Sequence, residues 1–88
     1  MKKSQIILRR EGGLHLRVAA QIVKEVKDHR SAVRFHHDGG APANAGSIFE
    51  LLALGAMEGA PIEITVEGPD EEATLKALSE VFEGGAGI

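Results

Sequence analysis

Apolar and polar residues alternate strictly between Ile62 and Glu67. Successive side chains of a β-strand point to opposite faces, so this segment can bury one face and leave the other in water. The alternation therefore predicts a strand in a sheet that is packed on one side only.

After Gly12 and Gly13, the apolar residues are spaced as on one face of a helix. Ala19, Ile22, Val23 and Val26 recur at helical spacing and predict an amphipathic helix that begins near Leu16. The opposite face of this helix is expected to be exposed to solvent, and it carries Lys24, Glu25, Lys27 and Asp28.

Two further helices are predicted from their termini. Ser47 and Glu50 form a capping-box pattern, and Gly55 is placed to end the helix that begins there. Asp70 is the predicted N-cap of the last helix, which Gly84-Gly85 ends. The buried stripe of that last helix is predicted to be Leu75, Leu78, Val81 and Phe82.

Three more strands complete the pattern. Gln5–Arg9 and Ala32–His37 are predicted strands, and a short edge strand is expected at residues 41–43, where Pro42 cannot donate to a ladder. The order β-α-β-β-α-β-α predicts an α+β open-faced sandwich with an antiparallel sheet and its helices on one face.

Composition narrows the class of protein. Residues 1–88 suit one domain, with 43% hydrophobic and 26% charged residues. A net charge of -3 and the absence of Trp and Tyr argue against nucleic-acid binding. The absence of Cys excludes disulfides and thiolate chemistry. Near the N-terminus the apolar run at residues 6–8 is too short for a signal peptide or a membrane span, so we expect a cytoplasmic protein.

The most informative segment is Gly12-Gly13-Leu14-His15-Leu16-Arg17. It places His15 at or beside the N-cap of the first helix, where unpaired N–H groups and the helix dipole favour phosphate and a neutral, nucleophilic imidazole. Arg17 can add donors for phosphoryl oxygens. These residues suit a phosphoryl acceptor, although a merely capping or solvated histidine has the same spacing.

Metal and nucleotide sites are not predicted. His36 and His37 are neighbours on a strand and should point to opposite faces, and His29, His36 and His37 are interpreted as solvated histidines. The chain has no phosphate-binding loop or Mg²⁺ cage, so no cofactor is expected.

The motifs resemble the histidine phosphocarrier protein (HPr) family of the bacterial phosphoenolpyruvate-dependent sugar phosphotransferase system. Three segments carry the likeness over nearly the whole chain: Gly13-Leu14-His15-Leu16-Arg17, Asn44-Ala45-Gly46-Ser47-Ile48, and Gly68-Pro69-Asp70-Glu71-Glu72-Ala73. The resemblance implies a four-stranded antiparallel sheet with three helices on one face. It also implies that His15 is phosphorylated on Nδ1 with Arg17 assisting.

The resemblance further implies partners. Enzyme I would donate the phosphoryl group and enzyme IIA proteins would accept it, so the chain would be a stoichiometric carrier rather than an enzyme, and we expect a monomer. Two residues depart from the family pattern, which usually has a small residue at position 16 and Pro at position 18, where this chain has Leu16 and Val18. We expect this change to slow phosphoryl transfer or to tune it to another partner, while Val18 also fits a simple extension of the apolar stripe.

Ser47 is a second candidate site, because in some relatives the matching Ser is phosphorylated by an HPr kinase/phosphorylase. The capping box alone also explains it. A docking patch for partners is predicted near His15, with a core role as the alternative for some of its members: Leu16, Ile48, Phe49, Leu51 and Leu52.

Two other functions stay open at this point. One is a regulatory HPr-type protein that signals through the phosphorylation state of His15 or Ser47, including a nitrogen-type phosphotransferase system. The other is a small-molecule-binding domain, which would need a convergent pocket.

Overall fold

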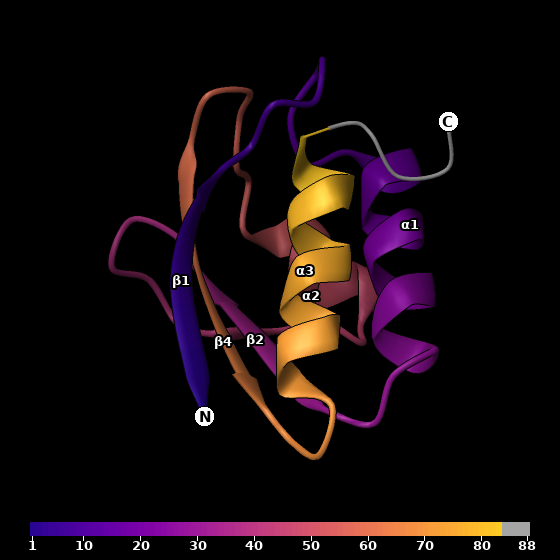
Figure 1. Ribbon diagram of the computed structural model, residues 1–88. Helices are drawn as coiled ribbons and strands as arrows, with labels where there is room; N and C mark the ends of the chain where they lie inside the picture. Colours follow the sequence, from indigo (N-terminus) through magenta and orange to yellow (C-terminus); the bar gives the residue numbers. More distant parts are fainter. Residues whose placement is uncertain (84–88) are drawn as a thin grey trace.

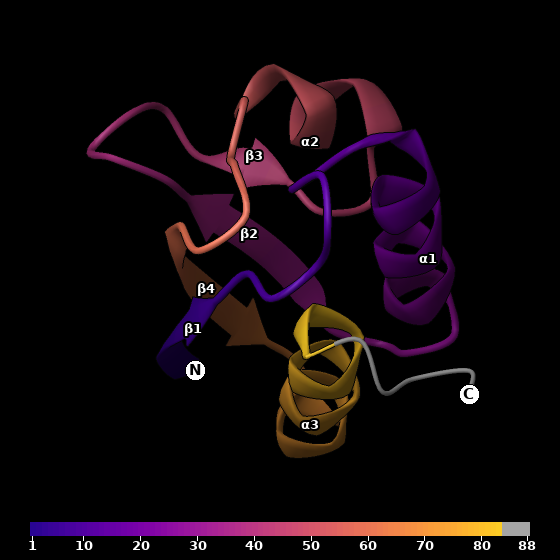
Figure 2. The same ribbon diagram turned by 90° about the horizontal axis from the view of Figure 1, so that it is seen from above.

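The computed structural model describes residues 1–83, and its strands form one antiparallel sheet in the order β1-β4-β2-β3. The three helices lie together on one face of this sheet, as Figures 1 and 2 show from two directions. The predicted open-faced sandwich is confirmed. The elements are β1 (Lys2–Ile7), α1 (Leu16–Lys27), β2 (Ala32–His36), β3 (Ala43–Asn44), α2 (Ile48–Ala53), β4 (Pro61–Glu67) and α3 (Glu71–Phe82).

The alternating segment forms β4, which lies between β1 and β2. Ile64 is paired with Ser4 on one side and with Phe35 on the other. Ile62, Ile64 and Val66 are fully buried against the helices, as their alternation predicted.

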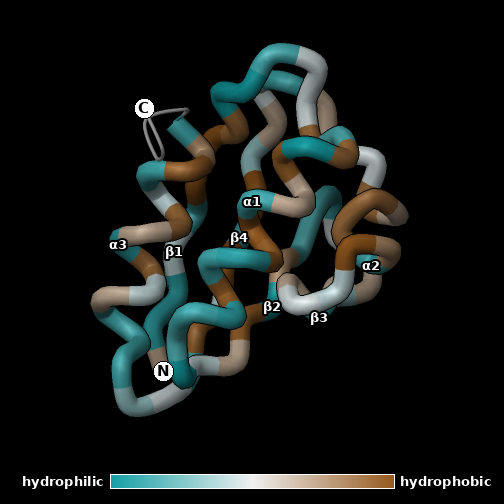
Figure 3. Tube along the Cα trace, turned by 90° about the vertical axis from the view of Figure 1, so that its right-hand side faces the viewer, coloured by the Kyte–Doolittle hydropathy of each residue, from teal (hydrophilic) through white to brown (hydrophobic). Residues whose placement is uncertain are grey.

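The core between sheet and helices is almost entirely aliphatic. Its aromatic contact joins Phe35 of β2 to Phe82 of α3, edge to face, with ring centroids 5.3 Å apart. Each helix contributes buried side chains, and α2 is apolar over most of its length (Figure 3).

The strand boundaries differ from the predicted ones. β1 covers Lys2–Ile7 rather than residues 5–9, because its pairing with β4 ends at Pro61. Beyond that point the Leu8 N–H donates to the Ala60 carbonyl and the Arg9 N–H donates to the Phe82 carbonyl. Likewise β2 ends at His36, and the edge strand is Ala43–Asn44 rather than residues 41–43.

The predicted capping box of α2 is only half formed. Ser47 is the N-cap, and its Oγ accepts from the Glu50 N–H at 3.3 Å. The Glu50 carboxylate does not return to Ser47 but accepts from the Asn44 N–H at 3.0 Å. The Ser47 N–H is satisfied instead by the Asn44 carbonyl, so Glu50 is free to tie α2 to β3. Gly55 follows the C-cap with φ of 64°, as predicted.

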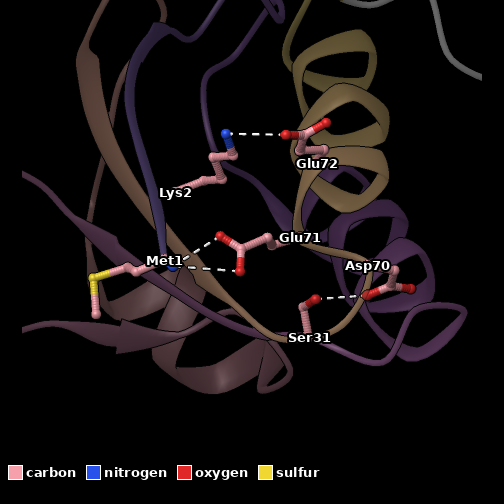
Figure 4. A network of polar contacts seen from close by, with 6 residues as sticks. All are labelled: Met1, Lys2, Ser31, Asp70, Glu71 and Glu72. Carbon is pink, nitrogen blue, oxygen red and sulfur yellow. Dashed lines mark hydrogen bonds and ion pairs between the residues drawn. The ribbon is translucent and has the colours of Figure 1, made fainter.

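Asp70 stands at the N-cap position of α3 without capping the helix through its side chain. Its carboxylate accepts instead from the Ser31 hydroxyl (Figure 4). It also accepts from the Arg30 N–H. In the same region Glu71 pairs with the Met1 amine and Glu72 with Lys2. Thr74 is buried where Leu75 was expected and Leu75 is half-buried, while Gly84-Gly85 lie outside the described residues.

Candidate functional site

His15 is the N-cap of α1, as predicted, with extended backbone angles of φ -96° and ψ 179°. The two preceding residues are glycines with positive φ, 82° at Gly12 and 75° at Gly13, a conformation that disfavours other residues. They turn the chain from the end of β1 into the helix and leave the imidazole exposed.

The loop that carries His15 is anchored to the segment after α2. The Leu14 N–H donates to the Ala56 carbonyl at 2.9 Å, and the Leu14 side chain is buried. A Cβ on Gly13 would lie 2.6 Å from the Ala56 carbonyl oxygen and 2.8 Å from the Met57 Cα. The two segments therefore touch backbone to backbone directly beside His15.

The imidazole of His15 accepts a hydrogen bond at Nδ1 from the Arg17 N–H, at 3.2 Å. An accepting Nδ1 carries a lone pair, so the proton of the neutral ring lies on Nε2. The cap thus fixes one tautomer of the ring and directs Nδ1 toward the N–H groups of the first helical turn.

A shallow depression surrounds this histidine. It is lined by Arg10, Glu11, Gly12, His15 and Arg17. The lining combines an imidazole nucleophile, two guanidinium groups and the start of a helix, which can hold a transferred phosphoryl group.

The predicted docking residues separate into two groups. Phe49 and Leu16 are 85% and 62% exposed, whereas Ile48 and Leu52 are half-buried. Leu51 is fully buried in the core, so its assignment to the docking patch was wrong. The sequence alone does not separate docking residues from core residues in α2, because this helix is apolar on more than one face.

Met57 was missed by the sequence analysis. It is 69% exposed and lies beside Gly13 in the loop after α2. A lone methionine in a glycine-containing loop has no periodicity, so no sequence pattern indicated it.

Val18, the other departure from the family pattern, is fully buried, which confirms that it extends the apolar stripe of α1. Ser47 is half-buried and acts as the cap of α2, and its phosphorylation stays a prediction.

The other histidines have separate surroundings. His36 Nδ1 lies 3.9 Å from Glu63, His37 Nδ1 lies 3.4 Å from the Pro61 carbonyl, and His29 Nδ1 lies 2.7 Å from the Glu25 carbonyl. In residues 1–83, no three His, Cys, Asp or Glu side chains gather closely enough to hold a metal ion. Over the same residues, no helix has the length and apolar character needed to cross a bilayer.

Comparison with known proteins agrees with the fold. The family model described as "PTS HPr component phosphorylation site" matches residues 2–84. The phosphocarrier protein HPr of Buchnera aphidicola is 37% identical over 82 residues, which cover 93% of this chain and 95% of that protein. The HPr-C-His structure from Thermoanaerobacter tengcongensis superposes with a TM-score of 0.90 at 33% identity, covering 100% of this chain and 98% of that one.

Longer relatives also match. The multiphosphoryl transfer protein of Salmonella typhimurium is 34% identical over 86 residues, which are 96% of this chain but 23% of that protein. The chain therefore spans about a quarter of the length of such relatives and nearly the whole length of the separate HPr proteins. With this family match, the fold shared with a solved HPr structure and a histidine at the N-cap of α1, the chain belongs to the HPr family of the phosphotransferase system.

Proposed function

We propose that this chain is a phosphocarrier that accepts a phosphoryl group on Nδ1 of His15 and passes it on to another protein. The observation that carries the proposal is the exposed His15 ring, whose Nδ1 lone pair is held at the start of α1 by the Arg17 N–H. Enzyme I is the proposed donor and enzyme IIA proteins are the proposed acceptors.

The transfer step follows from this arrangement. The lone pair of Nδ1 attacks the phosphorus of the donor's phosphoryl group, and the electron pair of the bond that breaks returns to the donor atom that carried the group. The His15 ring then carries a positive charge, which it keeps beside the phosphoryl dianion or loses as the Nε2 proton. No nucleotide or metal ion is consumed.

The Arg17 N–H has a different partner before and after the transfer. Once Nδ1 is bonded to phosphorus its lone pair is no longer available, so this N–H can donate to a phosphoryl oxygen instead. The Arg17 guanidinium, exposed in the same depression, supplies further donors to that dianion.

Partner proteins must approach over the exposed side chains around the histidine. Leu16, Phe49 and Met57 are the large exposed apolar side chains on the elements next to His15. We assign them to the docking surface together with the half-buried Ile48 and Leu52. The chain acts stoichiometrically, because each molecule must release its phosphoryl group before it can accept another.

The test is transfer from radiolabelled phosphoenolpyruvate through purified enzyme I to wild type and His15→Asn. Asn can replace the histidine as an N-cap acceptor, so the variant keeps the helix start without the nucleophile. We expect acid-labile label on wild type alone, and loss of that label when an enzyme IIA protein is added.

Label on both proteins would place the phosphoryl group on another residue. No label on folded wild type, with an enzyme I that phosphorylates a known carrier, would overturn the proposed donor.

A further inference from the structure

Arg10 lines the His15 depression, but the transfer step proposed above uses only His15 and Arg17. We propose that its guanidinium is a second phosphoryl-binding group, which acts with Arg17 on the dianion carried by His15. This inference rests on the proposed function.

The side chain of Arg10 is held in place by two other elements. Its Nη1 donates to the Gln21 Oε1 of α1 at 2.7 Å and to the Val81 carbonyl near the end of α3 at 3.0 Å. Both bonds use the same nitrogen, and the remaining N–H donors of the fork are not needed for them. The guanidinium is thus oriented without being saturated.

A preorganised guanidinium binds an anion more strongly than a free one, because less side-chain entropy is lost on binding. Arg17 has no such support, since it is an exposed side chain in the first turn of α1. The two arginines would therefore differ in kind, with Arg10 a fixed donor and Arg17 a mobile one.

Gly12, which lines the same depression, lies against the His15 ring. A Cβ at this position would lie 3.1 Å from the Cδ2 of His15, so any side chain here would crowd the ring. With glycine at position 12, no side chain of that residue crowds the His15 ring in the depression that Arg10 also lines.

The charge balance also favours a second cation. Glu11 lines the same depression and is exposed, and its carboxylate would oppose the arrival of a dianion. Arg17 alone would offset that carboxylate and leave little positive charge for the phosphoryl group. Arg10 restores a net positive lining around His15.

The test compares Arg10→Gln with Arg9→Gln after phosphorylation by enzyme I. Arg9 is the matched control, because it is the adjacent exposed arginine and does not line the depression. Phosphorus NMR as a function of pH reports the second ionisation of the phosphoryl group, which a nearby cation favours. The exchange equilibrium with phosphorylated enzyme I reports the stability of the bound group.

We expect Arg10→Gln to raise the phosphoryl pKa by about half a pH unit and to shift the exchange equilibrium toward enzyme I by about tenfold. Arg9→Gln should change neither value. A change confined to the thermal midpoint of Arg10→Gln, or equal effects of both variants, would reduce Arg10 to a structural tie and overturn the inference.

Nitrogen NMR of the wild type keeps the question decidable if Arg10→Gln does not fold. On phosphorylation the side-chain resonance of Arg10 should move and that of Arg9 should not, and an unmoved Arg10 resonance would also overturn the inference. Failure of the proposed function is distinct from both results, because wild type would then carry no label on His15 at all.

Discussion

The Ser31 hydroxyl donates a 2.6 Å hydrogen bond to the Asp70 carboxylate and so joins the loop between α1 and β2 to the start of α3. The Arg30 N–H donates to the same carboxylate at 2.9 Å and 3.1 Å. Gly68 completes the contact, since a Cβ there would lie 2.6 Å from the Ser31 Cα. Three donors thus converge on one acid, since Thr74 adds its hydroxyl at 3.1 Å.

These hydrogen bonds, that from Ser31 first and that from Arg30 next, lower the pKa of Asp70 below its ordinary value of 3.8. The stability supplied by ionised Asp70 is therefore present above that ordinary value and is lost as the pH falls through the lowered folded-state pKa. We expect Asp70→Asn to be less stable than wild type at about pH 7 and the gap to narrow below about pH 4.

Urea unfolding of both proteins across this range measures the gap. Glu72→Gln, an exposed carboxylate of the same helix, controls for the change in net charge. A gap that is the same at both ends of the range would show that the Asp70 cluster does not titrate with folding.

The contact of Gly13 with the loop after α2 predicts a steric cost. Gly13→Ala should destabilise the fold by about 2–4 kcal/mol, because the new Cβ meets backbone atoms as well as an unfavourable φ. Gly39→Ala is a matched control, with φ of 71° against 75° and nothing within 4 Å of its Cβ. It should cost only about 1 kcal/mol. Equal free energies of unfolding for the two variants would refute the close contact.

Leu51 and Phe49 lie two residues apart in α2, and we expect Leu51 to stabilise the core and Phe49 to contact partner proteins. Leu51→Ala should lower the free energy of unfolding by about 2–5 kcal/mol, because it leaves a cavity under α2. Phe49→Ala should change stability by less than about 0.5 kcal/mol and should raise the apparent KM of enzyme I for this chain. Chemical denaturation and initial transfer rates together check this, and a Phe49→Ala protein with unchanged transfer would exclude Phe49 from the docking surface.

The cap at His15 predicts a stability difference between two inactive variants. His15→Ala removes the acceptor of the Arg17 N–H, while His15→Asn replaces it. Alanine should therefore be less stable than asparagine by about 1 kcal/mol in thermal or urea unfolding. If the two variants were equally stable, the hydrogen bond to Nδ1 would make no contribution to the helix start.

The parts of the fold that the sequence predicted are those with strong periodicity. The alternation of β4 was predicted correctly, and so was the stripe of α1, although Val26 at its end is only half-buried, because each segment buries one face. The start of β1 was missed, because Lys2, Lys3 and Ser4 form an edge strand with no apolar alternation. Its strand conformation is imposed by β4, and no local signal in the sequence records that pairing.

Capping residues were located correctly, but the partners of the Glu50 and Asp70 carboxylates were not. Ser47 and Asp70 both stand where the helices begin. Glu50 turns to Asn44, and Asp70 turns to Arg30 and Ser31, which lies 39 residues away. The donor that a carboxylate binds depends on which N–H and O–H groups the fold brings close to it. That partner cannot be derived from spacing along the chain.

The residues of the candidate site also fall into those that a local sequence pattern predicts and those that only the fold brings into place. His15 and Arg17 belong to one local motif, whereas the Arg10 side chain is held by Gln21 and the Val81 carbonyl, and Met57 meets Gly13 from the loop after α2. Leu51 was assigned to the surface because its neighbours in α2 are also apolar. Only burial in the core distinguishes Leu51 from the exposed Phe49.

The position of β4 between β1 and β2 also bears on the order in which the chain can fold. Each of those strands pairs with β4, and Lys2 meets Val66, so most of the sheet is joined only by contacts between distant parts of the chain. Long-range pairing of this kind is slow to form. During synthesis the helix behind His15 can appear early, but its loop has no Ala56 carbonyl or Ala60 carbonyl to rest on until those residues have left the ribosome. The segment that carries the histidine is therefore anchored only after the chain has been made as far as Ala60.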